Sequence, residues 1–226
     1  TVLGSNGSGK STMFNVILGS LFPDEGKVYL GDKDITKLKQ SQLRDVYGNI
    51  QMVFQNPVGS FDPRRTLGDG IGESLRNRGM KKADVEKRVA ELLEQCGLEK
   101  EYAKRYPYEV SGGQCQRAAI ARALAVEPKV LICDEATSAL DVTIQKQVVE
   151  EMLLMREEYG TAMIVVTHNI GVVEKMADKV LVLKNGKVRE YGKTAQVLTA
   201  SEDPYTKELM SSVPRLKRTG TGNGGR

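Results

Sequence analysis

Nine residues near the start of the chain, from Gly4 to Thr12, have the types and spacing that bind phosphate groups. They fit the pattern glycine, any four residues, glycine, lysine, serine, in which backbone N–H groups converge on an anion at the start of a helix. In such a loop Lys10 reaches the outer phosphates of a nucleotide, and the Ser11 hydroxyl ligates Mg²⁺. The predicted nucleotide-binding residues are Gly4, Ser5, Asn6, Gly7, Ser8, Gly9, Lys10, Ser11 and Thr12.

Two carboxylates follow an apolar run, residues 130–133, that predicts a buried parallel strand. Asp134 and Glu135 stand at its carboxyl end, where open α/β sheets bind their ligands. We expect Asp134 to hold Mg²⁺ and Glu135 to act as general base on the water that attacks a terminal phosphate. The alternative is that the acidic pair caps the next helix; the upstream phosphate loop favours the catalytic interpretation.

A third string, from Ser111 to Gln114, precedes a run of good helix formers that ends near Leu124. Ser111 is a natural N-cap, and the two glycines after it expose helix-start N–H groups to an anion. Taken alone, the string favours an ordinary serine-capped helix.

Along the chain the string from Ser111 to Gln114 lies between the other two, and the three strings in that arrangement resemble the ATP-binding cassette (ABC) ATPases. The resemblance implies ATP and Mg²⁺ as cofactors and a helix start that faces the γ-phosphate bound by an opposite subunit, through Ser111, Gly112, Gly113 and Gln114. It also implies a Mg²⁺ set of Ser11, Gln55 and Asp134, a catalytic set of Glu135, His168 and Gln55, and a dimer-interface loop that contains Asp141. His168 is the only histidine. A lone histidine is usually structural or exposed, but its place after a predicted strand favours a γ-phosphate switch.

The segments between these motifs resemble the oligopeptide/dipeptide/nickel importer branch of the family, in residues 52–57, 60–64, 105–109, 203–209 and 212–214. This resemblance implies a second ATPase subunit, identical or related, beneath two membrane permease subunits. An extracytoplasmic solute-binding protein would deliver the solute, a peptide or nickel. The chain would lie peripherally on the cytoplasmic face of the cell membrane, with no nucleic acid as partner. Cys115 departs from the branch, where arginine is more common, and we expect it to be a neutral replacement.

The expected fold is an α/β P-loop NTPase with a mostly parallel sheet, an antiparallel edge at residues 26–31 and an inserted helical subdomain. The ATP-binding domain is predicted to span residues 1–214, with the helical subdomain and signature helix at about 67–124, and a disordered basic tail at 215–226. Asn185-Gly186 between two apolar runs predicts a hairpin.

Only Thr1, Val2 and Leu3 precede the phosphate loop. We therefore expect an N-terminally truncated domain, without its adenine-stacking aromatic residue, that binds ATP weakly.

Composition agrees with this interpretation. The net charge of +4 is too small to indicate nucleic-acid binding by itself. No apolar run approaches the roughly 18 residues of a membrane helix, and the three scattered cysteines suit a reducing cytosol. The predicted function is ATP hydrolysis that powers solute import. Two alternatives stay open: an ABC ATPase that acts on nucleic acid or ribosomes, and a non-hydrolysing nucleotide-binding fragment.

Overall fold

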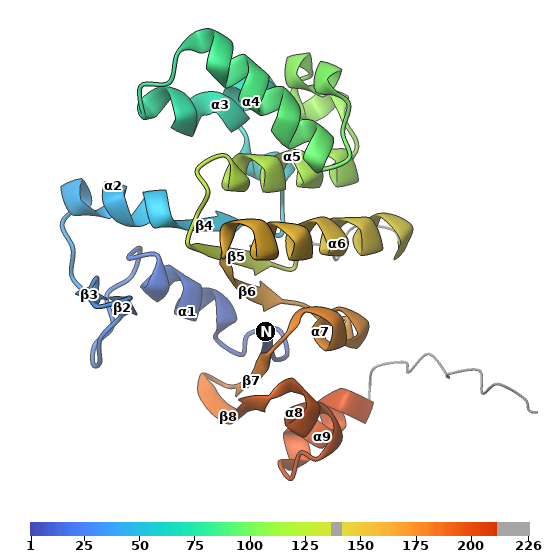
Figure 1. The fold of residues 1–226 in the computed structure, drawn as a ribbon. Helices are drawn as coiled ribbons and strands as arrows, with labels where there is room; N and C mark the ends of the chain where they lie inside the picture. The colour runs from blue at the N-terminus through green and yellow to red at the C-terminus, as the bar shows by residue number, and fades with distance from the viewer. Residues whose placement is uncertain (137–141, 212–226) are drawn as a thin grey trace, which may run out of the picture.

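A six-stranded sheet organises the chain in the computed structural model, which describes residues 1–136 and 142–211 (Figure 1). Its strands lie in the order β4 (Ile50–Val53), β5 (Val130–Asp134), β6 (Ala162–Val166), β1 (Val2–Leu3), β7 (Lys179–Lys184) and β8 (Lys187–Lys193). All neighbouring strands pair in parallel except β7 and β8, which form the hairpin predicted at Asn185-Gly186. This confirms the α/β class and the mostly parallel sheet.

Helices connect the strands. They are α1 (Lys10–Ile17), α2 (Gln40–Asn49), α3 (Leu67–Asn77), α4 (Lys82–Gln95), α5 (Gly112–Leu124), α6 (Val142–Tyr159), α7 (Ile170–Met176), α8 (Thr194–Thr199) and α9 (Pro204–Ser211), with the short 3-10 helices η1 (Val58–Ser60), η2 (Lys100–Lys104) and η3 (Pro107–Glu109).

Alternating side chains of β5 bury both faces of the sheet, as a parallel strand between helices requires. Leu131 and Cys133 join the apolar cluster of α5, α6 and α7, whereas Ile132, between them, joins the cluster of α1 and α2. Phe14 is the buried apolar residue of α1, and its apolar neighbours along the helix are only partly covered. The core therefore fixes α1, and the loop before it, against one face.

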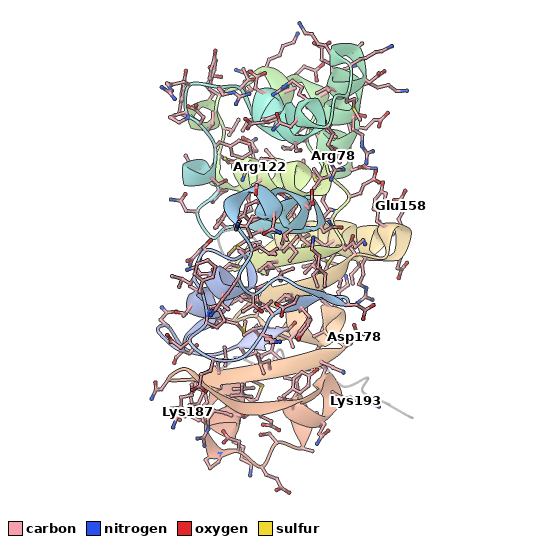
Figure 2. All side chains as sticks on the ribbon, turned by 90° about the vertical axis from the view of Figure 1, so that its left-hand side faces the viewer. Arg78, Arg122, Glu158, Asp178, Lys187 and Lys193 are labelled. Carbon is pink, nitrogen blue, oxygen red and sulfur yellow. The ribbon has the colours of Figure 1, made fainter. Side chains whose placement is uncertain are left out.

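A layer of α3, α4 and α5 stands beyond the β4 edge of the sheet (Figure 1). Two arginines join it to its neighbours (Figure 2). Arg78 donates to the carbonyls of Val126 at 3.1 Å and Gly48 at 3.2 Å. Arg122 donates to the carbonyl and hydroxyl of Ser60, in η1. Arg122 thus holds the segment that leads from β4 into the helical layer, and Arg78 holds the end of α3 against α2 and the turn after α5.

The strand expected at residues 26–31 exists, but it is shorter than expected and lies elsewhere. β2 (Tyr29–Leu30) pairs antiparallel with β3 (Lys33–Asp34) in a separate two-stranded sheet, so the antiparallel edge of the main sheet is β8. Gly31 adopts a φ of +59° at the turn between them, which keeps the two strands a local hairpin. The predicted tail at 215–226 lies outside the described residues. Within the described ranges, no helix is both long and apolar enough to span a membrane.

Two helix-start glycines give a test of this arrangement. A Cβ at Gly68, near the start of α3, would lie 2.7 Å from the carbonyl oxygen of Ala103, whereas a Cβ at Gly112, which begins α5, meets nothing within 4 Å. We expect Gly68→Ala to lower the unfolding free energy by about 1–3 kcal/mol, because backbone must shift to admit the methyl group. Gly112→Ala is the matched control and should not lower stability. Thermal denaturation measures both, and equal melting temperatures would contradict the close contact of α3 with η2.

Candidate functional site

The phosphate loop joins β1 to α1 through a turn that requires glycine. Gly7 and Gly9 have φ values of +75° and +102°, which favour residues without a Cβ. At Gly4 a Cβ would lie 2.5 Å from the carbonyl oxygen of Leu183 and 2.6 Å from Ser8 Oγ. The loop is therefore packed tightly onto the end of β7 at Gly4, while the backbone conformation accounts for Gly7 and Gly9.

Lys10 lies folded over this loop. Its ammonium group donates to the carbonyls of Gly4 at 2.8 Å and Ser5 at 2.9 Å, and its side chain is buried. The buried Ser8 hydroxyl has no hydrogen-bond partner in the described part of the chain. Ser11 and Thr12 are exposed at the start of α1. A buried cation, an unpartnered hydroxyl and a helix start with free N–H groups fit the phosphates of a nucleotide.

Three predicted catalytic residues, far apart in sequence, meet at the carboxyl ends of neighbouring strands. Gln55 Nε2 donates to Glu135 Oε2 at 2.8 Å, and His168 Nε2 lies 2.8 Å from Glu135 Oε1. Gln55 follows β4, Glu135 follows β5 and His168 follows β6. The Glu135 carboxylate is therefore held at both oxygens and presented at the edge of the sheet where parallel strands place their ligands.

The backbone at Glu135 is unusual. Its φ of +47° is rare for a non-glycine residue, while its N–H donates to the carbonyl of Val166 at 3.1 Å. Such a conformation costs on the order of 1–3 kcal/mol and persists where the surroundings enforce it. Here it turns the chain so that the carboxylate reaches Gln55 and His168.

Asp134 is the last residue of β5 and shares this end of the sheet. Burial, and next the charge of Glu135, raise the pKa of the Asp134 carboxyl, while the Lys10 ammonium opposes the rise. The electrostatic influence of Lys10 places the acidic pair beside the phosphate loop. The helix-cap alternative stays open, because residues 137–141, between the acidic pair and the described start of α6 at Val142, lie outside the described residues.

The predicted Mg²⁺ ligands can be judged by the chemistry of their donor atoms. The Ser11 hydroxyl, the Asp134 carboxylate and the Gln55 amide supply oxygen atoms, the ligand type that Mg²⁺ prefers. No group of three or more His, Cys, Asp or Glu side chains that could hold a metal occurs among the residues that the structure describes. The donors therefore fit a Mg²⁺ ion that shares its ligands with bound phosphates and water.

The predicted signature string begins α5 with a reciprocal cap. Ser111 Oγ accepts from the N–H of Gln114 at 3.3 Å, and Gln114 Oε1 accepts from the N–H of Ser111 at 2.8 Å. Ser111 and Gly112 are exposed. Within the described ranges no hydrogen bond or ion pair joins this string to the phosphate loop. The exposed helix start thus agrees with the expected role toward another subunit, which stays a prediction. Asp141, expected at that interface, lies outside the described residues.

Two contacts on the phosphate loop were missed by sequence reasoning. Gly186 N–H, in the β7–β8 turn, donates to the carbonyl of Ser8 at 2.9 Å, and Ser5 N–H donates to Tyr205 Oη at 3.0 Å. The sequence carried a signal for the hairpin turn, but nothing in the spacing of Tyr205, 200 residues away from Ser5, points to the loop.

Comparisons with known proteins agree with this geometry. Residues 1–138 match the family model described as ABC transporter. The chain is 44% identical over 215 residues to the oligopeptide transport ATP-binding protein OppF of Salmonella typhimurium, covering 94% of this chain and 64% of that protein. It is 43% identical over 215 residues to the glutathione import ATP-binding protein GsiA of Pectobacterium atrosepticum, and this match covers 95% of this chain and 34% of that protein. The chain thus spans less than two thirds of either curated relative.

Solved structures give the same result. The dimeric, post-hydrolysis structure of the ATP-binding cassette MJ0796 with ADP and Pi has a TM-score of 0.80 and 34% identity, covering 85% of this chain and 84% of that chain. CbiO1 of Clostridium perfringens, part of the ABC transporter complex cbiONQ, has a TM-score of 0.78 and 30% identity. The match covers 95% of this chain and 83% of that chain. These similarities confirm the predicted fold.

The raised pKa of Asp134 yields a stability prediction. A folded-state pKa above the ordinary value of 3.8 means that the folded protein binds this proton more tightly than the unfolded chain does. The ionised carboxylate therefore costs stability at neutral pH, and the cost disappears as pH falls through the folded pKa toward 3.8. We expect Asp134→Asn to melt higher than the parent chain at pH 7, by about 2–4 °C per kcal/mol for a domain of this size.

That difference should shrink as pH falls toward 4, because the folded protein then holds Asp134 increasingly in its uncharged form. Thermal denaturation without nucleotide across this range provides the measurement. Asp24→Asn, a change at an exposed position, is the control and should leave the melting temperature unchanged. An Asp134→Asn protein no more stable than its parent at pH 7 would contradict the electrostatic cost.

Proposed function

The chain belongs to the ABC transporter family, and from this premise we propose that it is the ATP-binding and ATP-hydrolysing subunit of an importer. One observation carries the proposal: the Glu135 carboxylate is held between Gln55 and His168 beside the phosphate loop. An acidic side chain oriented at both oxygens, next to a phosphate-binding loop, has the properties of a general base for phosphoryl transfer to water.

The residues divide the hydrolytic work between them. Backbone N–H groups of the loop would bind the phosphates, and Lys10 would exchange the Gly4 and Ser5 carbonyls for phosphate oxygens. Glu135 would accept the proton of the attacking water, while Gln55 and His168 hold its carboxylate in place. Mg²⁺, when bound through Ser11, Gln55 and Asp134, would neutralise charge on the phosphates.

A second cassette is part of the proposal. The exposed start of α5 offers the N–H groups of Gly112 and Gly113, which take no part in the cap between Ser111 and Gln114, and the similar MJ0796 cassette is dimeric in its structure with ADP and Pi. We place Ser111, Gly112, Gly113 and Gln114 at the nucleotide of the opposite subunit, with Asp141 at the interface. ATP would then join two cassettes, and hydrolysis would release them.

The proposed solute is a peptide. The two curated relatives are named for oligopeptide transport and glutathione import, and both solutes are peptides. Neither name supports nickel, the other solute considered from the sequence. A peptide importer would place this chain at the cytoplasmic face of the membrane, with a solute-binding protein delivering the peptide from outside.

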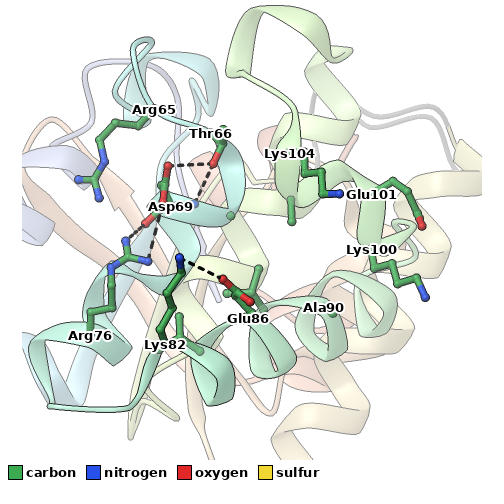
Figure 3. Close-up of a pocket in the computed structure, with 14 residues that line it drawn as sticks. Arg65, Thr66, Asp69, Arg76, Lys82, Glu86, Ala90, Lys100, Glu101 and Lys104 are labelled. Atoms are coloured by element: carbon green, nitrogen blue, oxygen red, sulfur yellow. Dashed lines mark hydrogen bonds and ion pairs between the residues drawn. The ribbon is translucent and has the colours of Figure 1, made fainter.

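The segment after β4 and the neighbouring helical layer are the proposed permease contact. Phe54 and Val58 are large apolar residues that are 47% and 44% exposed. Beyond them, Arg65 and Thr66 lie at one side of a cavity of about 590 Å³ among α3, α4 and η2 (Figure 3). Large exposed apolar groups in the segment that leads into the helical layer support a protein contact there.

The charges of this cavity favour an acidic partner segment. Arg76 and Lys82 pair with Asp69 and Glu86, at 4.0 Å and 3.9 Å. Lys100 and Lys104 also line the cavity, and neither forms an ion pair with any described residue. An amphipathic segment with acidic side chains would cover the apolar floor formed by Val85 and Val89 and neutralise these lysines.

The central test uses Glu135→Gln, which keeps the side-chain shape but removes the base. We expect the hydrolysis rate to fall by about 10²–10⁴-fold, while ATP binding remains and Mg-ATP converts monomers into a stable dimer. Phosphate release and solution mass measure the two effects. Glu127→Gln is the matched control, because Glu127 shares the positive φ of Glu135 (+51° against +47°) and pairs instead with Arg88.

Undiminished hydrolysis in Glu135→Gln would overturn the assignment of the base. A parent chain that binds ATP but never hydrolyses it would favour the non-hydrolysing alternative instead. A mass that Mg-ATP leaves unchanged would argue against pairing of two identical subunits, and the same measurement with a related cassette added would test a mixed pair.

The permease contact has its own test. We expect Lys104→Glu to reduce co-purification with permease subunits expressed alongside the chain, because it places an acidic group where an acidic segment should bind. Lys187→Glu, at the far end of the molecule on β8 (Figure 2), is the matched charge reversal and should leave co-purification unchanged. Equal loss of permease in both variants would contradict a contact confined to the helical layer.

A further inference from the structure

We propose that Tyr205, on the C-terminal helix α9, is a positioning residue that holds the phosphate loop in its nucleotide-binding form. The inference rests on the proposed function of that loop. It concerns a residue outside the part of the chain that the family model matches, residues 1–138.

The contact acts on the residue that also holds the loop's lysine. Ser5 N–H donates to Tyr205 Oη at 3.0 Å, while the Ser5 carbonyl accepts from Lys10 Nζ at 2.9 Å. Ser5 is therefore held on both sides, by the tyrosine and by the lysine of the loop. When Lys10 leaves the Ser5 carbonyl for a phosphate, the tyrosine remains as an anchor of the loop's first turn.

The neighbouring hairpin supports the same loop from a second point. Gly186 N–H donates to the Ser8 carbonyl at 2.9 Å, and Gly4 lies against the carbonyl of Leu183. Lys184, between them, places its ammonium 4.2 Å from the centre of the Tyr205 ring. This cation–π contact fixes the plane of the ring, so that the hydroxyl is presented to Ser5.

Helix α9 is itself anchored firmly enough to act as a support. Asp203 Oδ1 accepts from the N–H of Thr206 at 2.9 Å, and Asp203 Oδ2 accepts from Arg189 Nη2 at 2.8 Å and Nε at 3.1 Å. These hydrogen bonds, first among them that of Thr206, lower the pKa of the Asp203 carboxyl. Thr206 is fully buried, and Met210 packs in the apolar cluster of α7 and α8. A helix of eight residues would be marginal alone, so these contacts determine where Tyr205 lies.

The experiment compares two tyrosine hydroxyls. Tyr205→Phe keeps the ring and its lysine contact but removes the oxygen that accepts from Ser5. Tyr191→Phe removes the same group from β8, where the ring is 62% exposed and also lies under a lysine, Lys179, at 5.6 Å. Both variants should fold and melt like the parent chain.

Two readouts separate positioning from stability. In the nucleotide-free protein, Tyr205→Phe should accelerate hydrogen exchange in the segment that contains residues 4–12, because the Ser5 amide loses its acceptor. The dissociation constant of a fluorescent ATP analogue should rise about 3–10-fold, the factor expected for one net hydrogen bond. The hydrolysis rate at saturating ATP should change less than twofold, since the groups around Glu135 are untouched. Tyr191→Phe should change neither exchange nor affinity.

Unchanged exchange in Tyr205→Phe would overturn the proposal, and so would faster exchange with an unchanged dissociation constant. A parent chain that binds no nucleotide would overturn the proposed function instead. The exchange measurement does not require nucleotide, so it still tests the contact between Tyr205 and the loop.

Discussion

The register of three parallel strands is the constraint on which the rest of the site depends. Val53 of β4 pairs with Cys133 of β5, and Cys133 pairs with Val165 of β6. Two residues beyond this row lie Gln55 and Glu135, and His168 follows three residues beyond it. Side chains alternate along a strand, so a shift of one residue would turn the groups after each strand to the opposite face. The hydrogen bonds of Glu135 to Gln55 and His168 therefore follow from backbone pairing several ångströms away.

The stable core around β5 allows the site to contain residues that lower the stability of the fold. The site contains a glutamate with positive φ, an aspartate whose pKa is raised by burial, and a buried serine hydroxyl without a partner. Each feature costs stability, and each suits the binding of charged phosphate and metal. Leu131 and Ile132 are consecutive residues of β5 that pack on opposite faces of the sheet. Neither has any exposed surface, and together they hold β5 in both apolar clusters. Burial of the strand thus offsets the cost of the residues at its end.

The sequence predicted those parts of the fold that are encoded locally. The glycine pattern of the phosphate loop, the Asn185-Gly186 hairpin and the buried strand before Asp134 each follow from residues within about ten positions of one another. Cys133 is a small core residue of the predicted buried strand, and burial raises the pKa of its thiol to about 12. Cys115 is likewise fully buried, and burial raises the pKa of its thiol to about 11, while the expected lack of functional effect stays a prediction. The position of β2 was not predictable, because a short exposed strand gives no sign of which partner it pairs with.

Tyr205 could not be predicted for a different reason, and that reason bears on how the site forms. The two residues of β1 pair with β6 and β7, and the loop after β1 rests on the β7–β8 turn and on α9. The strand pairings and hydrogen bonds that reach β1 and this loop from β6, the β7–β8 turn and α9 therefore come from beyond residue 160, at sequence separations as large as 200. Such contacts form only after long loops have closed, which is entropically costly and slow. The loop at the start of the chain must consequently acquire its phosphate-binding shape late in folding, once the strands and helix from the other end are in place.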